Sequence, residues 1–180
     1  MTQLIEDLTE WLQKEVCDKM ALKKASTRGD SSYDYELVHP TAFPCFCPQQ
    51  DKAQLPTTPS VTVQIDSATD DLMNESLVNI ALVFSVWNTG THDNRNAEKP
   101  TFEKNLDGWK DLWRFIDKTR LAIRENFSIG GYEVKSEIHC RPLAGDNAIM
   151  GTYPYFFGEV TFAIGTIESP CGNIDIRKML

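Results

Sequence analysis

The strongest strand signal in the chain is the apolar run LVNIALVFSVW at residues 77–87. Four of its residues alternate onto one face: Ile80, Leu82, Phe84 and Val86. Val83 and Trp87 lie on the other face, and apolar residues on both faces are typical of a strand covered on both sides. The run therefore predicts a central strand, with the rest of the fold formed around it.

Three further strands are predicted from alternation of apolar and polar residues. Residues 60–65 precede the central run, and residues 132–140 and 155–166 follow it. An acidic polar turn is expected at residues 66–71, between the first strand and the central one. The four strands therefore fall into two hairpin-like pairs.

Two helices are predicted, at residues 3–20 and 109–127, because apolar residues recur there at a spacing of three to four. Thr2 and Asp107 are the expected N-terminal caps. A glycine pair at residues 130–131 is expected to end the second helix. The apolar stripe of the first helix must pack either on the sheet of this domain or on a neighbouring subunit.

The order of elements is helix, extended arm, two strands, helix, two strands. This order predicts an α+β fold, with a four-stranded, mostly antiparallel sheet packed by the long helix and the N-terminal helix. Residues 1–167 are expected to form one domain, in which the proline-rich residues 35–59 form an extended arm with at most short edge strands. Residues 168–180 are expected to be a C-terminal extension.

Composition limits the classes of function. The 180 residues carry a formal net charge of −8, whereas a protein that grips DNA through its phosphates needs a basic face. No stretch approaches the roughly 20 apolar residues of a membrane span. The N-terminus is acidic and amphipathic, unlike the cationic start of a signal peptide. We therefore expect a soluble protein that is made and kept in the cytoplasm.

No catalytic motif is recognisable, so neither an enzyme nor a cofactor is expected. The three histidines, His39, His92 and His139, stand apart from any nucleophile signature. Acidic residues near position 70 could bind a cation, but they lack the calcium-loop pattern, and a solvated turn is the preferred interpretation.

The five cysteines raise the alternative of a metal site or small-molecule site. Cys45 and Cys47 resemble half of a zinc site, to which Cys17 and His39 could contribute. The competing interpretation is that these cysteines are small buried hydrophobic residues. No metal ligand is assigned, and a binding domain built around Cys45 and Cys47 remains an alternative.

Two charged surfaces are candidates for contacts between subunits. The first is the basic face of the second helix: Lys110, Arg114, Lys118 and Arg124. The second is the acidic segment 66–75, through Asp66, Asp70, Asp71 and Glu75. A solvated helix face is the usual alternative for such basic residues. The aromatic pair Trp109 and Trp113 on the same helix is expected in the core.

A long polar loop at residues 88–107 is a third candidate, because loops of this length usually carry function or are mobile. Its candidate partner-binding residues are Asp93, Arg95, Lys99 and Lys104.

Four segments occur in a distinctive order: PSVTVQI at 59–65, VNIALVFSV at 78–86, DGWKDL at 107–112 and YPYFFGEVT at 153–161. In this order they resemble the tail terminator (tail completion) proteins of tailed phages and of related contractile particles. The proline-rich residues 38–48 resemble the segment that precedes the first strand of that family. The resemblance spans roughly residues 1–167. The chain departs from it in the loop 88–107 and in residues 168–180.

The resemblance implies a structural role. Such proteins form a homohexameric ring on the finished tail tube, stop its polymerisation and offer a surface to the head connector. The implied partners are copies of this chain, the tail tube protein, the head connector and, in contractile tails, the sheath protein. DNA passes through the channel without specific binding. The implied location is a virion or tail-like particle, assembled in the bacterial cytoplasm. Another phage neck or head–tail joining protein is the alternative.

Overall fold

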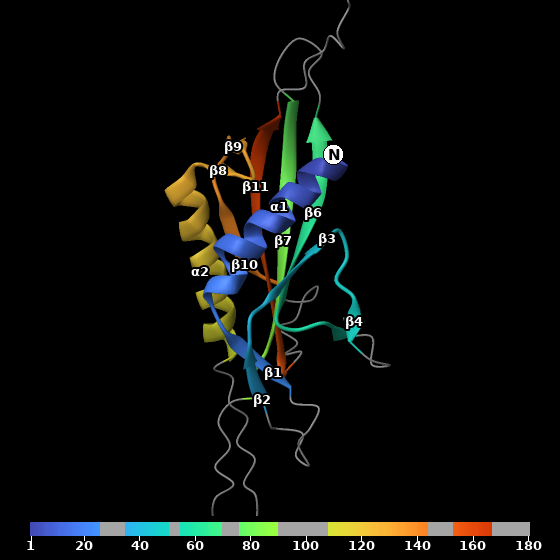
Figure 1. Ribbon diagram of the computed structural model, residues 1–180, viewed down its shortest axis with the longest axis vertical. Helices are drawn as coiled ribbons and strands as arrows, with labels where there is room; N and C mark the ends of the chain where they lie inside the picture. The colour runs from blue at the N-terminus through green and yellow to red at the C-terminus, as the bar shows by residue number, and fades with distance from the viewer. Residues whose placement is uncertain (26–34, 51–54, 70–75, 90–107, 144–152, 167–180) are drawn as a thin grey trace, which may run out of the picture.

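The structure of the protein is a computed structural model, which describes residues 1–25, 35–50, 55–69, 76–89, 108–143 and 153–166. Within these residues the chain forms an α+β fold, in which two helices pack on one face of a seven-stranded sheet (Figure 1). The predicted α+β class is confirmed. The predicted sheet of four strands is wrong, because short strands extend it on both sides.

The centre of the sheet consists of three long antiparallel strands. β7 (Ser76–Trp87) lies between β6 (Ser60–Thr69) and β11 (Tyr155–Thr166). The side chains of Val63 and Val160 both lie opposite Leu82. The prediction that the 77–87 run forms a central strand is confirmed.

Four short strands complete the sheet. β3 (Thr41–Pro44) pairs in parallel with β6 and comes from the proline-rich arm. β8 (Ser128–Ile129), β9 (Tyr132–Val134) and β10 (His139–Pro142) lie on the other side of β11. β3 and β8 show too few alternations to be recognised in a sequence, whereas β9 and the start of β10 fall within the predicted strand 132–140.

The predicted strand at residues 132–140 is interrupted between β9 and β10. Lys135 N donates to the carbonyl oxygen of Ala163 at 2.9 Å, and Ala163 N donates to Ser136 Oγ at 2.6 Å. A side-chain oxygen thus accepts the hydrogen bond that a strand carbonyl would accept. Ser136 therefore ends regular pairing without leaving the Ala163 amide unsatisfied.

The predicted acidic turn at residues 66–71 is also wrong for its described part, because β6 continues to Thr69. The register with β7 shifts between Ile65 and Ser67, which leaves Asp66 in a bulge. An extra residue in a strand bends it without ending it.

The arm between α1 and β6 carries two small hairpins besides β3. β1 (Leu22–Ala25) pairs with β2 (Tyr35–Val38), and β4 (Gln49–Gln50) pairs with β5 (Leu55–Pro56). β2, β4 and β5 lie within residues 35–59, the proline-rich segment predicted as an arm, whereas β1 precedes it.

The first helix ends five residues earlier than predicted, and the second agrees with its predicted bounds to within one residue at each end. α1 (Thr2–Glu15) is followed by a separate 3₁₀ turn, η1 (Cys17–Lys19), and α2 spans Gly108–Asn126. Thr2 is the first helical residue and not the cap, which is Met1 without a side-chain hydrogen bond. The predicted cap Asp107 lies outside the described residues. Neither helix is long and apolar enough to cross a membrane.

The glycine pair predicted to end α2 does not do so; Phe127, in a left-handed backbone conformation, follows the helix instead. Phe127 has a φ of 51° and follows the last helical residue, Asn126. Gly130 and Gly131, with φ of 56° and 93°, lie in the turn between β8 and β9. The glycine pair therefore makes a hairpin turn, where positive φ costs a glycine little.

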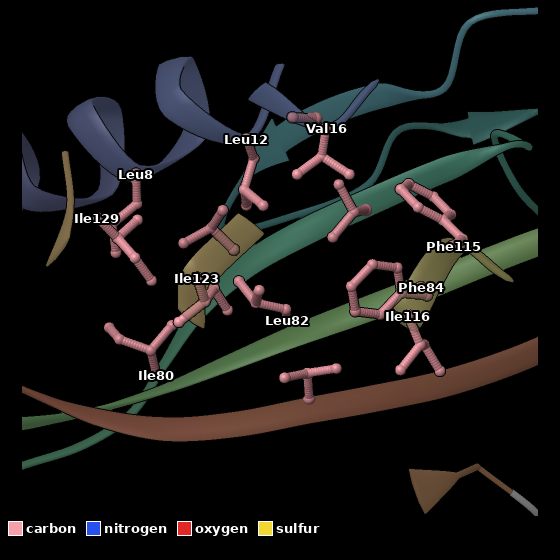
Figure 2. Close-up of a cluster of buried hydrophobic side chains, with 14 of the residues drawn as sticks. Leu8, Leu12, Val16, Ile80, Leu82, Phe84, Phe115, Ile116, Ile123 and Ile129 are labelled. Carbon is pink, nitrogen blue, oxygen red and sulfur yellow. The ribbon is translucent and has the colours of Figure 1, made fainter. Parts of the chain in front are cut away.

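The hydrophobic core lies between the helices and the sheet (Figure 2). It contains residues of α1, β7, α2 and β8, and Val16 directly after α1, that are at most 1% exposed: Leu8, Leu12, Val16, Ile80, Leu82, Phe84, Phe115, Ile116, Ile123 and Ile129. The Phe84 and Phe115 rings meet edge to face, 4.8 Å apart. Burial of each such side chain stabilises the fold by about 1.5–3 kcal/mol. The apolar stripe of α1 therefore packs on the sheet of its own domain.

Two glycines allow α2 to lie close to β11. A Cβ atom at Gly108 would lie 2.1 Å from a ring carbon of Phe156. A Cβ atom at Gly158 would lie 2.7 Å from Ile116 Cδ1. Gly108 belongs to the DGWKDL segment and Gly158 to the YPYFFGEVT segment, so two of the segments that carry the resemblance pack against each other.

Candidate interaction surfaces

The outward face of α2 carries the four basic residues singled out in the sequence. Lys110, Arg114 and Arg124 are exposed, and Lys118 is half-buried. The side chain of Arg114 is 71% exposed and lies 3.7 Å from a carboxylate oxygen of Asp111. An exposed ion pair of this kind contributes about 1 kcal/mol or less. Arg114 therefore remains available to a stronger partner.

Lys118 is already used within the chain. Its ammonium group donates a short hydrogen bond to the carbonyl oxygen of Lys19, at the end of η1. A lysine at this position satisfies a carbonyl group that has no partner inside the turn. Lys118 therefore links α2 to the α1–η1 segment. The side chains of Arg114 and Arg124 are exposed to solvent.

An open depression of about 730 Å³ lies along α2. Its walls include Glu15 and Lys19 from the α1–η1 segment, and its apolar residues come from α2: Trp109, Trp113, Leu121 and Ala122. Trp109 is 50% exposed and Leu121 is 47% exposed. Apolar side chains this exposed, surrounded by charges, are typical of a contact surface.

The expectation that Trp109 lies in the core is therefore wrong, although Trp113 does pack against the core. The reason is the position of Gly108, which is buried against Phe156. Successive residues advance by about 100° around a helix. Trp109 consequently lies at the margin of the buried stripe of α2.

A second hollow, of about 520 Å³, lies on the sheet. Its polar residues come from four neighbouring strands and the segment between β9 and β10: Asp66, Asn79, Ser136, His139, Arg141, Glu159 and Thr161. Arg141 Nε donates to Glu159 Oε2 at 2.6 Å, and the Glu159 side chain is 14% exposed. His139, which is predicted on a strand surface, is exposed at the start of β10 and borders this hollow.

The acidic candidates are only partly described. Asp66 is exposed and lines this hollow on the sheet, whereas Lys110, Arg114 and Lys118 line the depression along α2 and Arg124 does not. The other acidic candidates lie outside the described residues: Asp70, Asp71 and Glu75. The loop candidates lie outside them too: Asp93, Arg95, Lys99 and Lys104. The structure thus groups the basic residues and does not bring Asp66 to them within one chain.

An acidic surface on α1 was not singled out in the sequence. Glu6 and Glu10 are exposed on the outward side of the helix. Asp7, beside them, accepts a hydrogen bond from the Tyr132 hydroxyl at 3.0 Å. Burial, and then this bond to Asp7, raise the pKa of Tyr132. The spacing of Glu6 and Glu10 by four residues is the signal that could have identified this face.

The cysteines and histidines of the described part do not converge. Cys17 lies in the core, where burial raises the pKa of its thiol to about 12. Cys47 Sγ lies 3.4 Å from Ser60 Oγ, and His39 Nδ1 lies 2.7 Å from the carbonyl oxygen of Met20. Within the described ranges, no three His, Cys, Asp or Glu residues gather in a group that could hold a metal ion.

No known protein-family model matches this chain, and no curated protein sequence matches it either.

Proposed function

We propose that this chain is a structural tail terminator. In this role, copies of the chain form a ring, expected to be a hexamer, on the end of the tail tube. The ring stops polymerisation of the tube, and of the sheath in contractile tails, and provides the surface to which the head connector binds. The support from the sequence is the ordered set of four segments that resemble this family.

The observation that carries the proposal is the outward face of α2. It exposes about half of Trp109 and of Leu121 beside Arg114 and Arg124, in a chain of net charge −8. Tryptophan and arginine are over-represented among the residues that dominate binding energy at protein interfaces. A subunit that must bind copies of itself and the end of a tube needs such a surface.

Two of the four segments that carry the resemblance also pack against each other. The close contact of Gly108 with Phe156 and of Gly158 with Ile116 gives both glycine-containing segments one shared structural purpose, the docking of α2 on β11. This explains why the segments occur together, and it adds no claim about chemistry. The function we propose is mechanical and involves neither catalysis nor a cofactor.

The test is to mix purified protein with tail tubes. Light scattering should give the mass of a ring, either for the protein alone or after tubes are added. Electron microscopy should show that tubes polymerised with the protein are shorter and carry a density at one end. Protein that remains monomeric with tubes present, and leaves the distribution of tube lengths unchanged, would refute the proposal.

The alternative of another neck or head–tail joining protein predicts a different position. A tagged copy labelled with gold would then lie at the head vertex and would be missing from headless tails. A terminator is expected on headless tails as well.

A further inference from the structure

We propose that the contact between copies is made by the acidic outward face of α1 on one copy and the basic, tryptophan-containing face of α2 on the next. This inference rests on the proposed ring function, and it names the two surfaces that meet. It differs from the expectation drawn from the sequence, which paired the basic helix with the acidic segment 66–75.

The two helices carry opposite net charges. The segment from Thr2 to Lys19 contains five acidic residues and two lysines, whereas α2 contains five basic and three acidic residues. Within the described residues Glu6 forms no ion pair, whereas Glu10 pairs with Lys14 at 2.5 Å and Arg114 pairs with Asp111 at 3.7 Å. Ion pairs of exposed side chains contribute about 1 kcal/mol or less, so both groups can exchange partners on binding. Charge complementarity of this kind raises association rates and fixes the register of two surfaces.

The spacing of the charges also matches. Glu6 and Glu10 are four residues apart on the exposed face of α1, and Lys110 and Arg114 are four residues apart on α2. Four residues correspond to a rise of about 6 Å along a helix. Two helices lying side by side can therefore bring both carboxylates to both cations at once, while the carboxylate side chains cover the Trp109 ring with their methylene groups.

The two helices cover different strands of the sheet, so their outward faces are two separate surfaces of the subunit. α1 packs over β3 and β6, whereas α2 packs over β7 and β11 (Figure 1). The contact thus joins two unlike surfaces, and repetition of it produces either a closed ring or a filament. A pair of identical faces would stop at a dimer, which could not surround a tube.

Asp66 is the less suitable partner for α2. It lies in a bulge of β6 and borders the hollow on the sheet, whose other charges are the paired Arg141 and Glu159. It is thus a single exposed carboxylate, without a second one at helical spacing beside it among the described residues. The α1 face offers two exposed carboxylates at helical spacing.

The experiment uses two charge-reversed variants of the full chain. One carries Lys110→Glu and Arg114→Glu on α2, and the other carries Glu6→Arg and Glu10→Arg on α1. Each should assemble at least about tenfold more weakly than the unchanged protein, measured by light scattering with tail tubes present. An equimolar mixture should assemble again, because each reversed α1 then meets a reversed α2. Asp66→Lys is the control and should assemble normally.

The possible outcomes are distinct. Unchanged assembly of both reversed variants, or loss of assembly in Asp66→Lys alone, overturns the α1–α2 contact and leaves the ring function standing. Loss in each variant without recovery in the mixture overturns the contact too, because a general effect of the substitutions then explains it. Unchanged protein that never assembles, even on tubes, overturns both proposals. Thermal unfolding of each variant checks that all remain folded, as is expected for substitutions at exposed positions.

Discussion

The packing of α2 on β11 can be tested by adding one methyl group, with Gly158→Ala. The new Cβ would lie 2.7 Å from Ile116 Cδ1 and 3.3 Å from Leu112 Cδ1 and from the Arg141 carbonyl oxygen. Overpacking a core costs about 1–3 kcal/mol. Replacing glycine also lowers the conformational entropy of the unfolded chain, which stabilises the folded state by about 0.4–1 kcal/mol. We therefore expect the free energy of unfolding to fall by about 1–2 kcal/mol, measured by urea denaturation with linear extrapolation.

A double-mutant cycle identifies the cause. Ile116→Val alone should cost about 0.5–1.5 kcal/mol, but it removes the Cδ1 atom that lies nearest to the new methyl group. In the double variant we expect a loss smaller than the sum of the two single losses by about 1 kcal/mol. Ile123→Val, also buried on α2, is the matched control and should add independently to Gly158→Ala. Additive losses in both cycles would refute the clash with Ile116 as the reason for glycine at this position.

Further predictions concern the core, a buried thiol and the interrupted strand. Phe84→Ala removes a fully buried ring that meets Phe115 edge to face, and should lower the free energy of unfolding by about 3–5 kcal/mol in the same denaturation assay. Burial raises the pKa of the Cys17 thiol to about 12 in the folded state, against an ordinary value of 9.0. The thiol therefore stabilises the folded state below pH 9, and this contribution is lost as the pH rises towards 12. Over that pH range, the free energy of unfolding of Cys17→Ala should fall less than that of the unchanged protein. The same thiol should react with Ellman's reagent only after unfolding. Ser136→Ala should cost about 1–3 kcal/mol, because the Ala163 amide loses its acceptor, and should speed hydrogen exchange at that amide.

The long elements could be predicted because each repeats its pattern many times. Four residues of the 77–87 run alternate onto one face and the stripe of α1 recurs over about four turns, so a single atypical residue does not hide either pattern. β3 and β8 could not be predicted, since they have four and two residues and owe their strand form to pairing with β6 and β9. β10 could be predicted only as the end of a longer strand, because the interruption at Ser136 depends on a hydrogen bond to Ala163. The polar composition of residues 66–69 hid the continuation of β6, which is held by pairing with β7.

The basic surface could be read from the sequence, since helical periodicity places Lys110 and Arg114 on one side of α2. The exposure of Trp109 could not, because it depends on the close approach of Gly108 to Phe156, which lie 48 positions apart in the chain. The same is true of Lys118, whose role is set by its contact with Lys19. Such assignments depend on distant packing, which no local pattern records.

The close packing of α2 against β11 affects the entropy that the proposed assembly would lose on binding. Gly108 and Gly158 let the helix rest so near β11 that the side chains of Phe156 and Ile116 fill the remaining space. The helix can then neither slide along the sheet nor roll on it without a steric clash. Its outer face is consequently presented to a partner in one orientation before any encounter, and little conformational entropy remains to be lost on binding. Substitutions beneath α2 should for this reason weaken association even where they leave every exposed residue unchanged.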